Sequence, residues 1–251
     1  MCCSIDDVRS QKVLKLRQWR CSDAYHLLCQ TLDQEADDIL QYGLAYLDSF
    51  HEEQVIRKEF GSQSDLHRGF YCPSPVYDIF VGNVKRGKLL KNLTKRSANY
   101  YVYGFDESDK IIRVEQYRNC KLAVVEHICY IGPDIYGITL DQWGYLYQVT
   151  REEYQNNKLV TYSKVLFMHH RGIYDSIKLC RERYIYDEKG LHQCCFTQYM
   201  PAAELCDQTL YNFQRKDGKL VSYIASDVIG SEPYEKLSTS LPYCIFIDRN
   251  A

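Results

Sequence analysis

Two groups of histidines are the first candidates in the sequence for a metal site. The run His51-Glu52-Glu53-Gln54-Val55 begins like the helical zinc motif that carries two histidines four residues apart. Val55 stands where the second histidine would be, so the motif is incomplete. His169 and His170 are adjacent, and neighbouring side chains of an extended segment point to opposite faces. We therefore expect no metal site at either place.

His192 and Cys194 are two residues apart and would share one face of a strand. An imidazole in that position can lower the pKa of a thiol and make it nucleophilic. The sequence marks neither a third group that would orient the imidazole nor an oxyanion hole. Phosphate-binding glycine loops, dinucleotide-binding glycine motifs and the nucleophile elbow of hydrolases are also missing. We predict a protein that is not an enzyme and that carries no cofactor.

Cysteine is abundant, with 12 residues in a chain of 251. The cysteines include no pair at the two- to four-residue spacing of structural zinc sites. The first seven residues lack the basic and apolar regions of an export signal, and a chain of this length builds a core without disulfides. No run approaches the roughly 18 apolar residues that cross a bilayer. We expect reduced thiols, a cytoplasmic location and no membrane contact.

Charge is distributed unevenly although the net charge is only -2. A basic stretch extends from 85 to 96, and no acidic residue lies between Ile79 and Phe105. An acidic stretch precedes it. Both stretches can be explained without a function, as solvent-exposed faces of the protein. In a functional interpretation, the acidic residues would bind a basic protein partner and the basic residues would hold an RNA backbone. The named candidates are Asp37, Asp38, Glu52 and Glu53 for the partner, and Lys85, Arg86, Lys88 and Lys91 for nucleic acid.

The elements that must position these residues fall into two regions. Residues 1–70 read as a helical layer with helices over about 5–19, from Ser22 to Gln30, and from Thr31 onward. Ser22 is the expected N-cap of the second helix, Thr31 and Gln34 form a capping pair for the third, and Gly61 stands just past its end.

Residues 75–251 read as an antiparallel β-meander. Short runs rich in Tyr, Val, Ile and Thr alternate with turn signals about ten residues apart, and no helical pattern intervenes. The run Tyr117–Leu122 repeats in Tyr154–Leu159, and Phe105-Asp106 corresponds to Leu140-Asp141. We predict an α+β fold in which the helical layer packs, as one compact unit, on a long, curved sheet or open barrel.

Tyrosine accounts for 23 residues, most of them after residue 70. The bland interpretation is that these rings form cross-strand pairs that stabilise a thin sheet. The functional interpretation is a partner-binding surface, because tyrosine is enriched at the centres of protein interfaces. The candidates for that surface are Tyr101, Tyr103, Tyr184 and Tyr186.

The units Tyr186-Asp187 with Gly190, Phe105-Asp106 and Asp217–Leu220 resemble the Tyr-Asp pattern of YD/Rhs-type β-hairpin repeats. A helical N-terminal part, a Tyr-rich meander and no catalytic motif are also similar to bacterial immunity proteins of contact-dependent and Rhs systems. That resemblance implies a protein that binds a cognate toxin domain and occludes its active site, and it carries no functional residue. The alternative is a nucleic-acid-binding protein that uses residues 85–96. The sequence does not indicate an oligomeric state.

Overall fold

The computed structural model describes residues 5–46, 55–76, 85–94, 97–170, 172–216, 219–229 and 232–233. The chain divides into two compact units. Unit 1 combines residues 1–37 with 177–251, and unit 2 comprises residues 38–176. This division differs from the predicted boundary near residue 70, because the first and last parts of the chain belong to the same unit.

Two helices begin the chain, α1 (Ile5–Arg20) and α2 (Asp23–Tyr46). Ser22 is the N-cap of α2, as predicted, because its hydroxyl oxygen accepts a hydrogen bond from the Tyr25 N–H at 3.2 Å. The predicted helix start at Thr31 is wrong. The Thr31 hydroxyl donates to the Leu27 carbonyl one turn earlier, at 2.8 Å, and α2 continues without a break.

The segment from Arg57 to Tyr71, which begins at the end of the predicted third helix and continues into the Ser-, Gly- and Pro-containing stretch from Gly61 to Pro75 that reads as a connection, is not α-helical. It contains β1 (Arg57–Ser62) and the short 3-10 helix η3 (Gly69–Tyr71). Gly61 lies inside β1 opposite Tyr101, and a Cβ there would come within 2.7 Å of the Tyr103 hydroxyl oxygen. This glycine therefore permits a close approach between strands instead of ending a helix.

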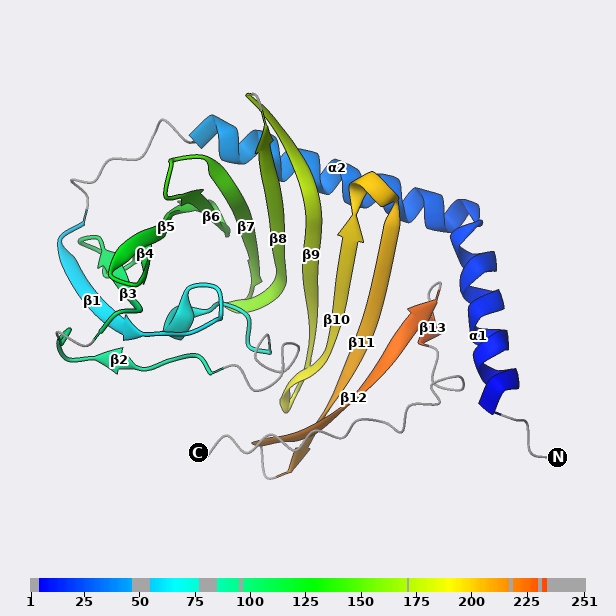
Figure 1. Ribbon diagram of the computed structural model, residues 1–251. Helices are drawn as coiled ribbons and strands as arrows, with labels where there is room; N and C mark the ends of the chain where they lie inside the picture. Colours follow the sequence, from blue (N-terminus) through cyan, green and yellow to red (C-terminus); the bar gives the residue numbers. More distant parts are fainter. Residues whose placement is uncertain are drawn as a thin grey trace. The chain divides into compact units, whose positions relative to one another are not determined.

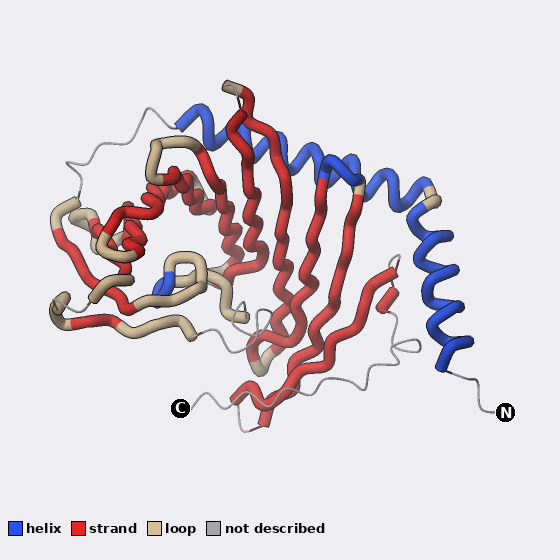
Figure 2. The backbone as a smooth tube through the Cα atoms, viewed as in Figure 1, coloured by secondary structure: helices blue, strands red, loops and turns tan. Residues whose placement is uncertain are grey.

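Unit 2 contains an antiparallel sheet in which strands consecutive in the chain mostly pair with each other. Figures 1 and 2 show its strands curving around residues 63–76, which we call the inner segment. In spatial order the strands are β2 (Leu89–Leu90), β1, β3 (Tyr100–Phe105), β4 (Ile111–Arg118), β5 (Lys121–Ile131), β6 (Asp134–Asp141), β7 (Leu146–Gln155) and β8 (Lys158–His170).

Unit 1 combines the start of the chain with the last described strands. The Tyr25 hydroxyl of α2 donates to the Glu204 carbonyl at 2.9 Å and accepts from the Cys206 N–H at 2.9 Å. Arg181 forms an ion pair with Glu35 of α2 at 2.5 Å. The remaining elements are β9 (Ile173–Asp187), which begins in unit 2, β10 (Gly190–Met200), η4 (Pro201–Ala203), β11 (Leu205–Lys216), β12 (Lys219–Ile229) and β13 (Glu232–Pro233).

The predicted α+β class and the antiparallel meander are confirmed at this level. Within each unit the described strands form an open row whose first and last members do not pair. The predicted hairpin repeat is also visible, because Tyr117 pairs with Leu122 across one turn and Tyr154 pairs with Leu159 across another. Both turns have two residues with positive φ: Asn119 at 51° with Cys120 at 61°, and Asn156 at 50° with Asn157 at 60°.

Candidate functional site

The inner segment is held against the sheet of unit 2 by two buried tyrosines. The Tyr101 hydroxyl lies 3.1 Å from the Ser64 carbonyl oxygen and 3.0 Å from that of Leu66. The Tyr103 hydroxyl donates to the Arg68 carbonyl at 3.0 Å. Tyr101 is 4% exposed and Tyr103 is 0% exposed, so burial removes both from the predicted partner surface.

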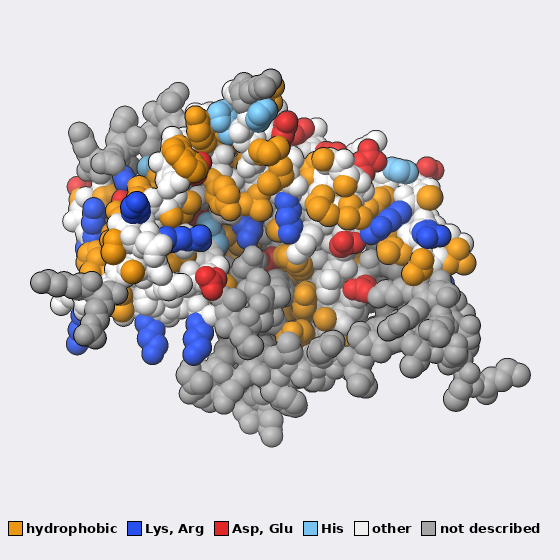
Figure 3. All heavy atoms as spheres, viewed as in Figure 1, with side chains coloured by type: hydrophobic (Ala, Val, Ile, Leu, Met, Phe, Trp, Pro, Cys, Tyr) orange, Lys and Arg blue, Asp and Glu red, His pale blue; other side chains and the backbone are white. Residues whose placement is uncertain are grey.

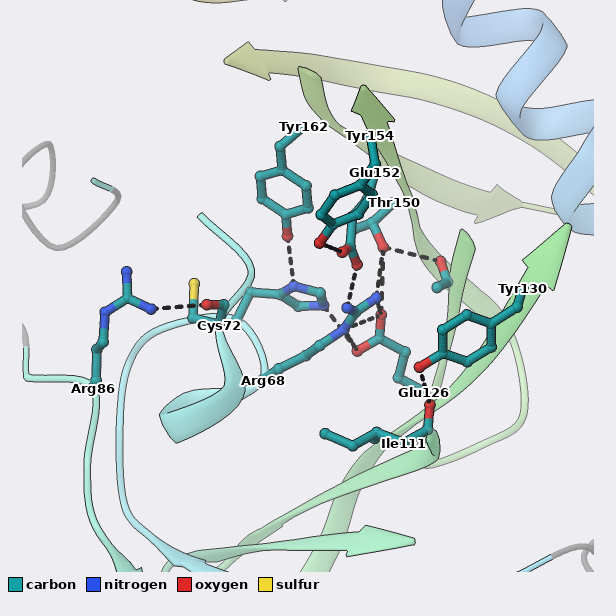
Figure 4. A network of polar contacts seen from close by, with 12 residues as sticks. Arg68, Cys72, Arg86, Ile111, Glu126, Tyr130, Thr150, Glu152, Tyr154 and Tyr162 are labelled. Carbon is teal, nitrogen blue, oxygen red and sulfur yellow. Dashed lines mark hydrogen bonds and ion pairs between the residues drawn. The ribbon is translucent and has the colours of Figure 1, made fainter. Parts of the chain in front are cut away.

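Arg68 extends from the inner segment into a buried network of charges on strands β5 and β7. Its Nε lies 3.0 Å from the Glu126 carboxylate, and its Nη2 lies 2.8 Å from Glu126 Oε1 and 3.2 Å from the Thr150 hydroxyl oxygen. Its Nη1 donates to Glu152. Figure 4 shows the guanidinium between these groups. The network joins the inner segment to the sheet and pairs one cation with two carboxylates.

His67 extends this network toward β8. Its Nδ1 lies 2.6 Å from the Tyr162 hydroxyl oxygen, and its Nε2 lies 3.0 Å from Glu126 Oε2. Burial lowers the pKa of His67, and the neighbouring Glu126 only partly opposes this effect. Burial also raises the pKa of Tyr162 well above its usual value. Both pKa shifts agree with a neutral His67 imidazole. Its Nδ1 then accepts a hydrogen bond from the Tyr162 hydroxyl, and its Nε2–H faces the Glu126 carboxylate.

The carboxylate of Glu126 stays ionised inside the protein. Burial alone would raise its pKa, but the charge of Arg68 and the adjacent His67 lower the pKa to well below the usual range. Burial works against the charge of Arg68 too, yet Glu126 and Glu152 raise its pKa well above the usual value. Each charge of the network therefore depends on its partners for stability.

Gly137 of β6 makes room for the network. A Cβ at this position would overlap Glu126 Oε1, Arg68 Nη2 and, at 2.5 Å, the Thr150 hydroxyl oxygen. The Gly137 carbonyl also lies 3.5 Å from the Thr150 hydroxyl. Sequence reasoning missed Arg68, Glu126 and Gly137, because nothing local in the sequence indicates that these residues meet.

A second pattern, a tyrosine two residues after a glutamate, is visible in the sequence, but we predicted no contact from it. Three tyrosines donate their hydroxyls to the glutamate two residues earlier: Tyr117 to Glu115 at 3.0 Å, Tyr154 to Glu152 at 2.9 Å and Tyr184 to Glu182 at 2.5 Å. Because Tyr184 is 5% exposed and engaged in this way, it too is removed from the predicted partner surface.

A cavity of about 500 Å³ opens beside the network in unit 2. Its wall includes His67, Arg68 and Glu126, and Trp143 and Tyr147 stand at its rim, 72% and 47% exposed. Its volume is within the range of small-molecule sites in proteins.

Exposed aromatic and apolar side chains gather where two hairpins of unit 2 end. The ring of Tyr145 stacks on His169 at 4.2 Å, and His169 lies 4.6 Å from the ring of Tyr174. Figure 3 shows hydrophobic side chains close to histidines at the top of the face in view. We call these two hairpin ends the hairpin-end patch: Tyr145, His169 and Tyr174 are in ring contact, and the exposed side chains of Trp143, Met168 and Ile173 lie within two residues of them in the sequence.

The other predicted site residues are scattered. Asp37 and Asp38 are exposed on α2, whereas Glu52 and Glu53 lie outside the described residues. Tyr186 is half-buried in unit 1. In the basic stretch Lys85, Lys88 and Lys91 are exposed, but Arg86 donates to the carbonyl oxygens of Cys72, at 2.8 Å, and Ser74. The guanidinium of Arg86 therefore anchors the inner segment.

The arrangement of His192 and Cys194 differs from the predicted shared face. A β-bulge between Leu191 and Gln193 displaces His192, which is exposed, while Cys194 is fully buried. Burial raises the pKa of the Cys194 thiol, which is the opposite of what activates a nucleophile. The described cysteines are free thiols, and the described residues contain no cluster suited to a metal ion.

Comparison of the sequence with protein-family models and with curated proteins finds no match. Neither described helix combines the length and the apolar character that crossing a membrane requires.

Proposed function

We propose that this chain is a protein-binding module that contacts its partner through the hairpin-end patch. The observation that carries the proposal is the exposure of large side chains there: Trp143 is 72% exposed, Tyr145 46%, Met168 54% and Ile173 63%. Clusters of exposed large apolar side chains are typical of interaction sites, and tryptophan and tyrosine supply much of the energy of protein interfaces.

The most concrete form of this proposal is an immunity protein that occludes the active site of a bacterial toxin domain. The resemblance to immunity proteins supports this partner. The exposed carboxylates Asp37 and Asp38 on α2 add negative charge that favours a basic partner. The curved sheet serves as a scaffold in this proposal, since the buried charges of Arg68 and its neighbours are already paired with one another.

Co-expression with the toxin-like product of a neighbouring gene tests the proposal. The chain should co-purify with that product and abolish its toxicity. Replacing both Trp143 and Tyr145 by alanine should weaken the complex by several hundred-fold, because two hot-spot residues at about 2 kcal/mol each contribute about 4 kcal/mol. The matched control is Ile185→Ala in unit 1, a side chain that is 52% exposed and outside the patch.

The proposal fails if no toxin-like neighbour binds, or if the double variant and the control bind equally well.

Binding of single-stranded RNA would instead favour the alternative function. The exposed Lys85, Lys88 and Lys91 support that alternative. RNA affinity should then fall steeply with salt and with reversal of charge at Lys88 and Lys91.

A further inference from the structure

Buried polar side chains line the cavity beside the Arg68 network. Thr139 is 4% exposed, and its hydroxyl has no hydrogen-bond partner among the described residues. Gln148, whose side chain is 5% exposed, also lines the cavity. The two residues pair across β6 and β7, and both border the cavity. Leaving the buried Thr139 hydroxyl unpaired costs about 1–3 kcal/mol, and a bound ligand that pairs with it removes this cost.

The charges around the cavity balance. Three acidic residues (Asp65, Glu126 and Asp141) and three basic residues (Arg68, Arg118 and Lys164) line it, so they sum to zero. The low pKa of His67 keeps its imidazole neutral near pH 7. A lining without net charge does not select an anion such as phosphate or a strong cation. It favours an uncharged ligand that both donates and accepts hydrogen bonds.

Aromatic rings complete the site. Trp143 and Tyr147 line the cavity at its rim, and both present large exposed surfaces. The C–H face of a sugar ring can pack on such an aromatic side chain, while its hydroxyls reach polar groups below. A hydroxyl donates one hydrogen bond and accepts two, so it pairs with the amide of Gln148 and the hydroxyl of Thr139 in either orientation.

We propose that the cavity binds an uncharged sugar ring, either free or at the end of a glycan. Thr139 and Gln148 hydrogen-bond to its hydroxyls, and the rim aromatics cover one face. This site is distinct in chemistry from the hairpin-end patch, although Trp143 lies at the edge of both. The sugar site does not require the proposed protein partner.

Ligand-observed NMR and isothermal titration with a panel of neutral monosaccharides test the proposal on the full chain. Nucleosides and inorganic phosphate serve as comparison ligands. At least one sugar should bind with a Kd in the millimolar range or tighter, and neither comparison ligand should bind as well. The proposal is overturned if no sugar binds, or if a nucleoside or phosphate binds more tightly.

Thr139→Val and Gln148→Leu should each weaken sugar binding by about tenfold, the equivalent of one lost hydrogen bond. Thr139→Val should not lower the melting temperature, because the hydroxyl it removes has no described partner. Thr197→Val is the control. Thr197 is 1% exposed in unit 1 and accepts a hydrogen bond from Gln208 at 3.1 Å, so its variant loses stability and keeps full sugar affinity.

Equal sugar affinity in Thr139→Val and the unmodified chain would overturn the role of this cavity. If either buried variant fails to fold, Tyr147→Ala decides, because that side chain lines the cavity, is 47% exposed and lies outside the hairpin-end patch. Thr139 lies outside the hairpin-end patch, so Thr139→Val should bind a protein partner normally. Failure of the sugar site and failure of the proposed function are thus separable.

Discussion

Gly137 illustrates how a single missing methyl group governs the buried network. A Cβ at this position meets Glu126, Arg68 and Thr150 together, and Arg68 is hydrogen-bonded to both of the other side chains. Gly137→Ala should therefore cost about 3 kcal/mol or more, because it both overpacks the interior and separates a buried ion pair. Urea unfolding measures the change in free energy.

Gly104→Ala is a matched substitution in the same sheet. A Cβ at Gly104 meets mainly the terminal methyl groups of Val55, at 2.9 Å. Making room requires Val55 to move but breaks no buried ion pair, so we expect the ordinary overpacking loss of about 1–3 kcal/mol, smaller than that of Gly137→Ala. Similar losses for the two variants would show that the Gly137 site has room to adjust.

The meeting of Arg68 with Glu126 is not predictable from the sequence. Arg68 lies in a stretch that reads as a connection, and Glu126 occupies an ordinary strand position. The partners of Tyr101 and Tyr103 are equally hard to predict from the sequence. Alternating aromatic residues indicate a strand, yet which face is covered depends on where the inner segment folds back. Local patterns establish side-chain alternation and leave long-range partners undetermined.

At the scale of elements, two hairpins of unit 2 share the same five-residue turn. The Asp106 carboxylate accepts from the N–H groups of Ser108 and Lys110, both at 2.9 Å. The Asp141 carboxylate does the same for Trp143 at 2.8 Å and Tyr145 at 3.0 Å. These bonds replace ladder pairings at the strand ends.

Replacing Asp106 or Asp141 by alanine should each lower the free energy of unfolding by about 1–2 kcal/mol, because two backbone N–H groups lose a charged acceptor. Asp187→Ala is the comparison, since its carboxylate accepts a backbone hydrogen bond from the Lys189 N–H, at 2.7 Å, and otherwise lies 3.7 Å from Nδ1 of the exposed His192. Its loss should be about half as large. An equal or greater loss for Asp187→Ala would contradict the assigned role of the two-bond turns.

Hairpins were predictable because their signals are local. Asp, Asn and Gly residues at fixed offsets define the turn, and the flanking aromatic and aliphatic residues define the pairing. The helical region was harder to predict. Thr31 and Gln34 satisfy the spacing of a capping pair, but residues with high helix propensity on both sides allow α2 to continue past Thr31. A capping pattern alone does not establish a helix start.

For the whole molecule, the buried network predicts how stability depends on pH. The pKa of His67 is lower in the folded protein than the roughly 6.5 of an exposed histidine. Below pH 6.5 the unfolded chain therefore binds more protons, and stability falls as pH decreases. Glu126, whose pKa is also lowered, adds a second loss below about pH 4.3. Both effects have the same sign.

Urea unfolding between pH 5 and pH 8 measures this dependence. The slope contributed by His67 can reach about 1.4 kcal/mol per pH unit and should be missing in His67→Gln. His26→Gln provides a control at an exposed histidine of unit 1. Parallel pH profiles for the unmodified chain and His67→Gln would contradict the prediction.

The interrupted sequence of unit 1 has a consequence for synthesis on the ribosome. Residues 1–37 leave the ribosome before the rest of unit 1, because the strands they pack against begin only at residue 177. All of unit 2 emerges in between, and its consecutive hairpins can pair as they appear. During this time the side chains of Tyr25, Cys29 and Leu32 on α2 are exposed to solvent, although all three are buried in the folded protein. Nascent chains stalled before residue 177 should expose this surface and depend on chaperones more than the complete chain does.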